Sequence, residues 1–375
     1  MRRNASVSGF RTVLFIFLGI ICPVSLDAEV LNDSAHSQPW YESISINGFL
    51  SSAYSYNFNK PDSMKNEYRV FDVDDNSFKV DAFELVFQRP VIKSGDAGFR
   101  VDMVAGSSIP HVARSSGFNI GDLDFHQTFL SYIAPVGNGM RFDIGKFITT
   151  MGYEVIEGYD GYNYNYSHSF LFGYAIPYTH TGIKASYSFN QEISGMMMIV
   201  NGWDNSIDSN TSKSICGQVI VNPTTNMNLS VNYMFGPEKG NNNSDNRRLF
   251  DFVGTYTINA SVTTGINGDY GVEQHSAGNG GDAVWLGAAV YCRVNLFSDF
   301  SLSFRAEQFE DRDGLRTKIA QKLRELTLTP EFRQSEHFII RGDARIDTSD
   351  KNIFETEDQW KDTQTTLGIN FIYTF

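Results

Sequence analysis

The side chains best suited to act on a solute are concentrated between residues 149 and 179. This stretch carries three carboxylates, Glu154, Glu157 and Asp160, among several tyrosines. The tyrosines nearest these carboxylates in the sequence are Tyr153, Tyr159, Tyr162, Tyr164 and Tyr166. Carboxylates that face a cationic wall across a narrow passage would set a transverse field, which orients dipolar solutes and screens them by charge. The tyrosine rings could instead stack on sugars, or simply fill the core of a loop.

The cationic side of such a passage has five candidates, each on the polar face of an alternating segment. They are Arg100, Arg141, Arg305, Arg341 and Arg345. If these arginines oppose the carboxylates, they complete the transverse field. If they pair with neighbouring acids along a wall, they only solvate that wall, and the sequence leaves both interpretations open.

Serine and histidine side chains raise the alternative of a barrel hydrolase. His168 lies between Ser167 and Ser169, and His126 and His180 are further candidates. Nucleophilic catalysis needs a serine, a base and a third group that orients the base. Adjacent residues on an extended chain point apart, and no acid is positioned beside them. We therefore expect no enzyme.

The remaining chemical signals are also negative. The histidines and cysteines show no metal-ligand spacing, and there is no phosphate loop or dinucleotide fingerprint, so we expect no metal and no cofactor. Cys216 and Cys292 fall on the eighth and twelfth predicted strands, roughly 19 Å apart around a wall whose strands are about 4.8 Å apart. A disulfide needs Cα atoms within about 7 Å, so both cysteines are predicted to be free.

The elements that carry these residues show a period of two along almost the whole chain. The last nine residues are typical, because Leu367, Ile369, Phe371, Tyr373 and Phe375 alternate with mostly polar residues. Successive side chains of a strand point to opposite faces, so each segment has one apolar and one polar face. We count sixteen such strands, most of 10 to 14 residues. Soluble strands centre on about 5–6 residues, whereas a tilted strand needs about 9–11 to cross a bilayer.

The connections alternate between short turns and longer loops. An even number of strands with short periplasmic turns and long extracellular loops is typical of an outer-membrane barrel. Lipid offers no hydrogen-bond partners, so such a sheet must close on itself. The prediction is an all-β transmembrane antiparallel barrel of about sixteen strands with a water-filled lumen. Within the loop at 310–322 we expect a short helix.

The N-terminal segment of the chain has the features of a signal for export from the cytoplasm. Residues 1–28 read as a signal peptide with a basic start and an apolar run from Val13 to Val24. Residues 29–42 would then be a periplasmic lead-in, and 43–375 the barrel. The full chain of 375 residues has a net charge of −13, which argues against a nucleic-acid partner. Removing 1–28 takes away three Arg and one Asp, a net of +2, and leaves about −15.

The segment 122–188 resembles the β-barrel porin-2 family of Gram-negative outer membranes. The resemblance rests on Gly145-Lys-Phe, Gly152-Tyr-Glu and the run Tyr166-Ser-His-Ser-Phe170. It implies a porin in the outer membrane, with membrane lipid and small hydrophilic solutes as partners. By analogy with general porins, the loop after the fifth strand narrows the lumen, and proteins of this size are often homotrimers. The terminal Phe371, Tyr373 and Phe375 resemble the signal recognised by the barrel assembly machinery.

The resulting prediction is a channel for passive diffusion, with 149–179 as its constriction. Two alternatives stay open. One is a substrate-specific channel for a sugar or an anion, and the other is a plugged barrel with a structural or adhesive role.

Overall fold

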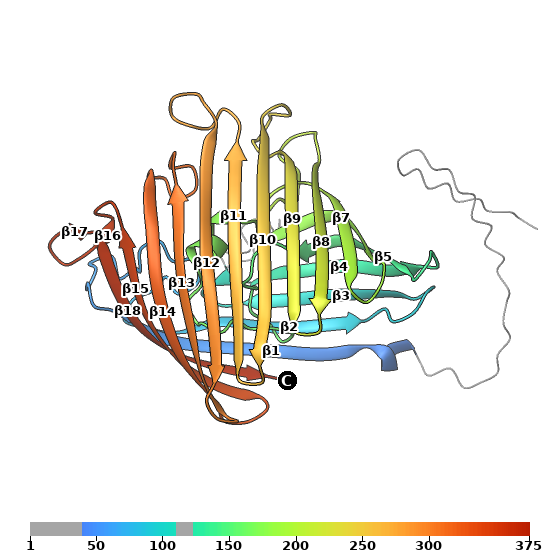
Figure 1. Cartoon of the computed structure of the whole chain (residues 1–375), viewed down its shortest axis with the longest axis horizontal. Helices are drawn as coiled ribbons and strands as arrows, with labels where there is room; N and C mark the ends of the chain where they lie inside the picture. The colour runs from blue at the N-terminus through green and yellow to red at the C-terminus, as the bar shows by residue number, and fades with distance from the viewer. Residues whose placement is uncertain (1–39, 110–122) are drawn as a thin grey trace, which may run out of the picture. The chain divides into compact units, whose positions relative to one another are not determined.

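Sixteen strands form one closed antiparallel barrel, in which each strand pairs with its neighbours in sequence and β1 pairs with β18 to close the ring (Figure 1). The strands are β1 Ser45–Asn57, β2 Ser77–Arg89, β3 Ala97–Ala105, β4 Leu123–Ala134, β5 Met140–Ile148, β6 Thr179–Ser188, β7 Ile193–Val200, β8 Ser214–Thr224, β9 Met227–Pro237, β10 Asn246–Asn259, β11 Val262–Glu273, β12 Ala283–Asn295, β13 Phe300–Asp311, β14 Gln321–Arg333, β15 Phe338–Ser349 and β18 Thr363–Thr374. The predicted strand number and closed topology are confirmed.

This computed structural model describes residues 40–109 and 123–375. The predicted signal peptide, and the lead-in up to residue 39, lie outside the described residues. A short 3₁₀ helix, η1 Trp40–Ser43, belongs to a separate unit that ends at Ser43. Within the described ranges, no helix is long and apolar enough to cross a membrane.

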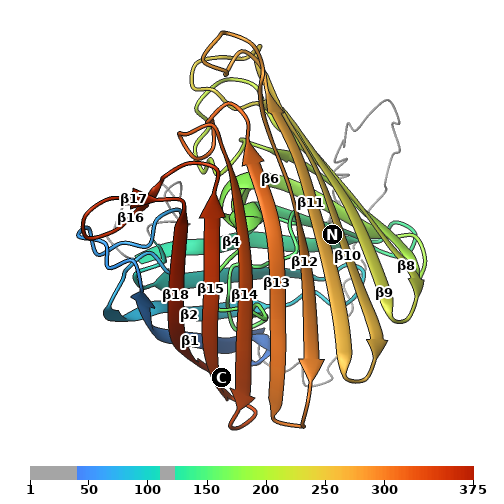
Figure 2. The ribbon, with the colours of Figure 1, turned by 60° about the vertical axis from the view of Figure 1, so that its left-hand side comes forward.

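The two rims of the barrel differ, as the loop lengths predict. Figure 2 shows the tight turns that join β8 to β9, β10 to β11, β12 to β13 and β14 to β15 along one rim, called here the short-turn rim. The opposite rim, called the long-loop rim, carries the longer connections. One of these contains a two-stranded hairpin, β16 Phe354–Glu355 with β17 Trp360–Lys361.

The expected helix at 310–322 is wrong. β13 runs to Asp311, β14 begins at Gln321, and the residues between them form turns. The Asp311 carboxylate accepts the backbone N–H groups of Leu315, Arg316 and Thr317 at 3.0, 2.8 and 2.7 Å. These amides therefore bind a side chain rather than the carbonyls of a helical turn.

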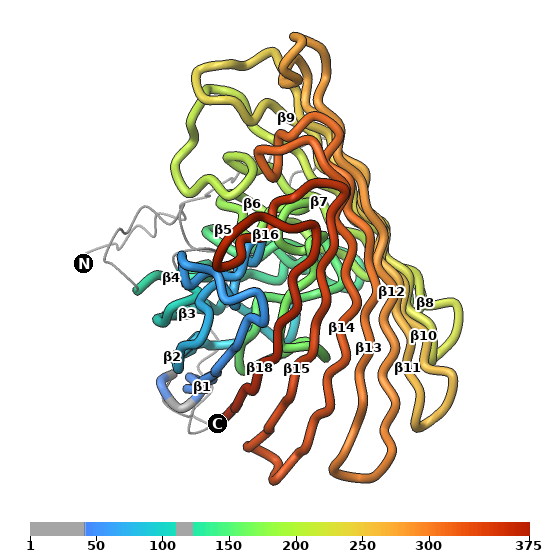
Figure 3. Tube along the Cα trace, turned by 90° about the vertical axis from the view of Figure 1, so that its left-hand side faces the viewer, coloured from blue at the N-terminus to red at the C-terminus, as the bar shows by residue number. Residues whose placement is uncertain are grey.

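Each wall strand has one face toward lipid and one toward the lumen. Along β13, Ser301, Ser303, Arg305 and Glu307 are buried, while Phe304 between them is exposed. Figure 3 shows β12 to β15 and β18 side by side, so that the outward residues form a continuous apolar surface. Charged residues inside and apolar residues outside suit a watery lumen within lipid.

The lumen is less polar than the period of two predicts. Met198, Leu249, Trp285, Phe309 and Leu323 point inward and are almost fully buried. They lie near the long-loop rim, where they pack in one apolar cluster with residues of the loop between β5 and β6. The inward-facing side chains are therefore polar and small only along part of the height of the barrel.

The ring closes around Gly48 and Phe375. Their backbones exchange two hydrogen bonds, of 2.8 and 3.0 Å. A Cβ atom on Gly48 would lie 2.2 Å from the Phe375 ring, so the glycine makes room for the terminal aromatic side chain. The free state predicted for Cys216 and Cys292 is confirmed.

Candidate functional site: a loop held across the lumen

The loop between β5 and β6, residues 149–178, runs inside the barrel and contains the π-helix η2 Leu171–Ala175 (Figures 1 and 2). Its backbone binds inward-facing side chains on opposite parts of the wall. The N–H of Tyr159 donates to Glu84 on β2 at 2.8 Å, and the N–H of Gly152 donates to Asp251 on β10, half the ring away, at 3.2 Å. The loop therefore spans the lumen.

The first of three charged anchors joins the loop to β13. Arg305 donates to Glu154 of the loop at 2.7 Å and to Glu325 of β14 at 2.6 Å. Its guanidinium also donates to the carbonyl oxygen of Ser167 at 2.6 Å. All three charged side chains are almost fully buried. A buried arginine that holds two carboxylates and a carbonyl uses most of its five donors.

The second anchor joins the loop to β15. Arg341 makes two hydrogen bonds to the Glu157 carboxylate, of 3.0 and 3.2 Å, in the fork geometry of an arginine–carboxylate pair. It also donates to the carbonyl oxygen of Asn163 at 2.6 Å and to the side chain of Asn370 at 2.8 and 3.0 Å. This arginine therefore clamps two points of the loop onto the wall.

The third anchor joins the loop to β3. Arg100 pairs with Asp160 of the loop at 2.7 Å and with its wall neighbour Asp102 at 2.8 Å. Its guanidinium also lies 5.5 Å from the centre of the Tyr159 ring, within the range of a cation–π contact. Asp160 is half exposed, so this anchor is the most hydrated of the three.

The other two predicted wall arginines behave differently. Arg345 donates to the carbonyl oxygen of His168 in the loop and pairs with Asp347 at 2.6 Å. Arg141 pairs with Asp143 at 2.8 Å near the short-turn rim, its side chain is 43 % exposed, and it makes no contact with the loop within the described ranges. Four of the five arginines thus touch the loop.

A second loop reinforces the anchor at Arg345. Arg69, between β1 and β2, pairs with Asp347 at 2.6 Å and also with Asp72. Burial alone would raise the pKa of Asp72, but Arg69, Arg345 and Lys79 outweigh it and hold that pKa below its usual value. Asp72 therefore stays ionised and keeps Arg69 in place.

The predicted carboxylates and arginines are in direct contact rather than opposed across an open gap. Glu154, Glu157 and Asp160 each neutralise a wall arginine. A pair at contact distance has a field that falls off rapidly, whereas separated charges would act across the passage. The expected transverse field is therefore largely cancelled where the loop meets the wall.

Aromatic and glycine residues complete the fit of the loop. Tyr153 stacks on Tyr291 of β12, with ring centres 3.9 Å apart, and covers Gly265 of β11, where a Cβ would meet the ring at 2.2 Å. Leu171 covers Gly287 in the same way, at 2.6 Å. Figure 1 shows η2 behind the upper part of β12. The inward glycines on β11 and β12 are thus recesses that accept loop side chains.

The remaining tyrosines and most of the candidate hydrolase residues bond to or stack on other residues of the loop and wall. Tyr166 donates to Asp81, and Tyr162 bonds to Arg333. The five serine and histidine candidates were His126, His168, His180, Ser167 and Ser169. Ser167 donates to Asp343 at 2.8 Å, and His180 contacts the Gly202 carbonyl and Thr149 at 3.3 and 3.2 Å. His168 stacks on Phe71, and its burial lowers the pKa of its ring, so the ring is neutral at pH 7.

The lumen opens toward the short-turn rim. Along the inward face of β10, Leu249 and Asp251 are fully buried, Thr255 is half-buried and Thr257 is exposed. Arg293 and Arg333, on the corresponding parts of β12 and β14, are partly exposed. The loop also reaches this end, where Tyr162 bonds to Arg333 and Tyr164 lies 4.8 Å from the Arg293 guanidinium, so only wall residues next to the rim are exposed. Among the described residues, no group of three or more His, Cys, Asp or Glu could hold a metal ion.

Sequence reasoning missed the wall partners of the loop. Trp285 donates its indole N–H to the Ala175 carbonyl at 3.0 Å, and Glu307 accepts the N–H groups of Phe170 and Leu171. The sequence does carry one signal of these contacts, because residues 196–200 are apolar on both faces and include the inward-facing Met196 and Met198. An apolar residue at inward parity indicates a packed lumen rather than a watery one.

A closed sixteen-stranded barrel with an apolar outer wall and a loop folded inward defines a porin-type protein of the bacterial outer membrane. Residues 43–375 match the family described as putative beta-barrel porin-2, OmpL-like, and the chain belongs to this family. A comparison with curated proteins gives no match.

Solved structures share the fold at low sequence identity. The outer-membrane channel DcaP of Acinetobacter baumannii has 9 % identity and a TM-score of 0.63, over 88 % of this chain and 97 % of that one. The anion-selective porin from Comamonas acidovorans has 10 % identity and a TM-score of 0.59, over 88 % and 99 %. OmpF of Salmonella typhi, in complex with daunomycin, has 9 % identity and a TM-score of 0.61, over 88 % and 97 %.

Proposed function

We propose that this porin passes small hydrophilic solutes by diffusion, and that loop 149–178 is its constriction. The observation that carries the proposal is the set of three ion pairs that hold the loop inside the lumen, to Arg100 of β3, Arg305 of β13 and Arg341 of β15. A loop fixed in this way leaves a passage of defined width, which selects solutes by size. No covalent step is needed, and we expect no enzymatic activity.

The charge of the passage follows from which groups are left unpaired. The loop carboxylates neutralise Arg100, Arg305 and Arg341, so the paired passage carries little net charge at the loop. Neutralising the three carboxylates removes three negative charges and makes the passage more positive. Selectivity would then shift toward anions, because a ring of one charge favours the opposite ion.

The test is single-channel current under a salt gradient, with the chain lacking residues 1–28 refolded into a planar bilayer. Discrete current steps and a defined reversal potential are expected for the unaltered protein. The triple variant Glu154→Gln, Glu157→Gln, Asp160→Asn should shift the reversal potential toward the anion side. The matched control is Glu357→Gln with Asp358→Asn, two exposed acids of the β15–β18 loop, which should leave it unchanged. An unshifted potential in the triple variant would refute the constriction.

A second candidate function, a closed barrel with a structural or adhesive role, is favoured by the apolar cluster in the lumen. Met151, Phe170, Leu171 and Phe172 of the loop pack against inward wall residues such as Trp285. Protein that inserts correctly but carries no current would support this candidate over the channel. A saturable current blocked by added sugar or anion would instead identify a substrate-specific channel.

The partners expected for this porin follow from its class. We expect outer-membrane lipid around the wall, small solutes in the lumen, recognition of Phe371, Tyr373 and Phe375 by the assembly machinery, and a homotrimer. The oligomeric state is testable by native mass spectrometry of the refolded protein.

A further inference from the structure

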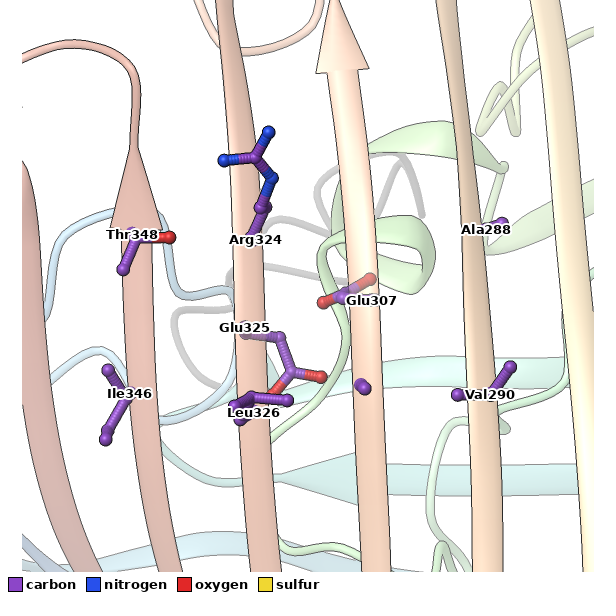
Figure 4. A pocket seen from close by; sticks show the side chains of 9 residues that line it. Ala288, Val290, Glu307, Arg324, Glu325, Leu326, Ile346 and Thr348 are labelled. Carbon is purple, nitrogen blue, oxygen red and sulfur yellow. The ribbon is translucent and has the colours of Figure 1, made fainter.

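The outer wall of the barrel carries a cavity of about 490 Å³ across β12, β13, β14 and β15 (Figure 4). Glu307 and Glu325, whose carboxylates bind partners inside the lumen, line it together with seven outward-facing residues. These are Ala288, Val290, Ala306, Arg324, Leu326, Ile346 and Thr348. The cavity thus faces the membrane and is separate from the lumen.

The shape of this cavity follows from the strand register. Val290 of β12, Ala306 of β13, Leu326 of β14 and Ile346 of β15 are direct neighbours across the sheet. Val290 and Leu326 are 49 % and 52 % exposed and stand on either side of the small Ala306. The Ala306 methyl group is shorter than the Val290 and Leu326 side chains on either side of it, which leaves an apolar trough along the wall. Ala288 lines the same trough on β12.

One end of the trough carries a cation. Arg324 lies three residues after the start of β14, about 10 Å along the strand from the long-loop rim. Its Nε donates to Gln308 at 2.8 Å, and within the described ranges its two Nη atoms have no hydrogen-bond partner. In Figure 4 the Arg324 side chain points along the wall away from the apolar residues. It therefore presents its free donors at the level of lipid headgroups.

The surface beyond Arg324 carries charges of both signs. Lys322 and Arg312 share a single carboxylate, Glu310, at 3.4 and 3.1 Å. All three side chains are partly exposed. Asp350 and Asp313 accept backbone N–H groups at the same ends of β14 and β12, so Arg324, with its free Nη donors, is the cation here that would attract a negative headgroup.

We propose that this trough binds a phosphorylated lipid, with an acyl chain against Ala306 and the phosphate on Arg324. The apolar trough excludes a free phosphate as the occupant, because only a lipid buries hydrocarbon there. Arginine binds phosphate through two parallel N–H donors, and Arg324 has such donors free. The site lies on the outside of the wall, so it does not depend on conduction through the lumen.

The test is native mass spectrometry of the refolded chain in detergent, titrated with lipid A and, separately, with phosphatidylcholine. We expect bound lipid A to survive detergent removal, and phosphatidylcholine, whose headgroup has no net charge, to bind about tenfold more weakly. Arg324→Gln should weaken lipid A binding about tenfold, and Ala306→Phe should abolish it by filling the trough. Folding of each variant is checked by its shift in unheated gel electrophoresis.

The matched control is Arg248→Gln. Arg248 is an outward arginine near the long-loop end of β10 and lies 5.9 Å from the Phe235 ring, away from the trough. Equal losses in Arg248→Gln and Arg324→Gln would overturn the proposal, since binding would then reflect general surface charge. A species of two or more chains that Ala306→Phe dissociates would also overturn it, by assigning the trough to a second copy of this protein.

Discussion

Arg305 is a fully buried charge in the lumen, and its removal gives a quantitative test of the loop anchors. Arg305→Met keeps a long side chain but deletes the bonds to Glu154, Glu325 and the Ser167 carbonyl, of 2.7, 2.6 and 2.6 Å. Glu154 then stays buried without a cation, and Glu325 keeps only Arg345, at 3.7 Å. Breaking a buried ion pair in this way costs about 3–5 kcal/mol. We expect the free energy of unfolding to fall by that amount.

The assay is urea unfolding of the protein in lipid vesicles, followed by tryptophan fluorescence. Trp203 and Trp285 belong to the apolar cluster around the loop, so their emission reports its packing. The triple variant Arg305→Met, Glu154→Gln, Glu325→Gln removes the charge imbalance as well as the ion pairs. It should recover at least half of the lost stability, because a neutral replacement avoids the unpaired buried charges.

Arg141→Met is the matched control, because Arg141 is also an inward wall arginine with an aspartate partner but is largely hydrated. Its loss should cost less than about 1 kcal/mol. Similar costs for Arg305→Met and Arg141→Met would refute the assignment of Arg305 as a buried anchor. An unchanged current in Arg305→Met would further separate the stability of the loop from its role in conduction.

Three further changes test other parts of the structure. Gly265→Val places side-chain atoms where Tyr153 packs and should expose the loop to chymotrypsin at a cost of about 1–3 kcal/mol, whereas Gly268→Val, whose Cβ would meet nothing closer than 3.9 Å, should not. Phe375→Ala should slow the appearance of the folded band in unheated gels, and an unchanged folding rate would argue against a role in closure. Burial raises the pKa of Glu238 to about 7 from 4.5, so the folded protein holds a proton that the unfolded chain releases. Stability should therefore fall by up to about 3 kcal/mol as pH rises from about 5 to 8, and Glu238→Gln should show a flatter profile.

The barrel itself is predictable from sequence because one constraint acts on every strand. Outward residues must suit lipid, so residues 363–374 and the other crossing segments repeat the same alternation. The length of each segment follows from bilayer thickness, and loop lengths separate the two rims. The helix expected at 310–322 failed because a single side chain, Asp311, satisfies the local amides, and such a contact leaves no periodic trace.

The lumen was only partly predictable. Composition indicated that 149–179 is distinctive and that the wall arginines face inward. It could not indicate which groups meet, since Glu154 and Arg305 are 151 residues apart and their contact depends on barrel geometry. The inward Trp285 and Gly265 were missed for a similar reason. The role of each residue can be inferred only when the loop residue that packs on it is known.

The same long separations have a consequence for how the chain matures. The wall partners of the loop lie far downstream, as with Ser167 and Asp343, 176 residues apart, and Glu157 and Arg341, 184 apart. Once β1 and β18 have joined, the only ways into the lumen are the two rims. The loop must therefore bind β10 to β15 while those strands are being added to the sheet. The last step, pairing of β1 with β18 at Gly48 and Phe375, then encloses the loop in the lumen. A chain that closes too early would become a kinetic trap, with an empty interior and an unbound loop outside.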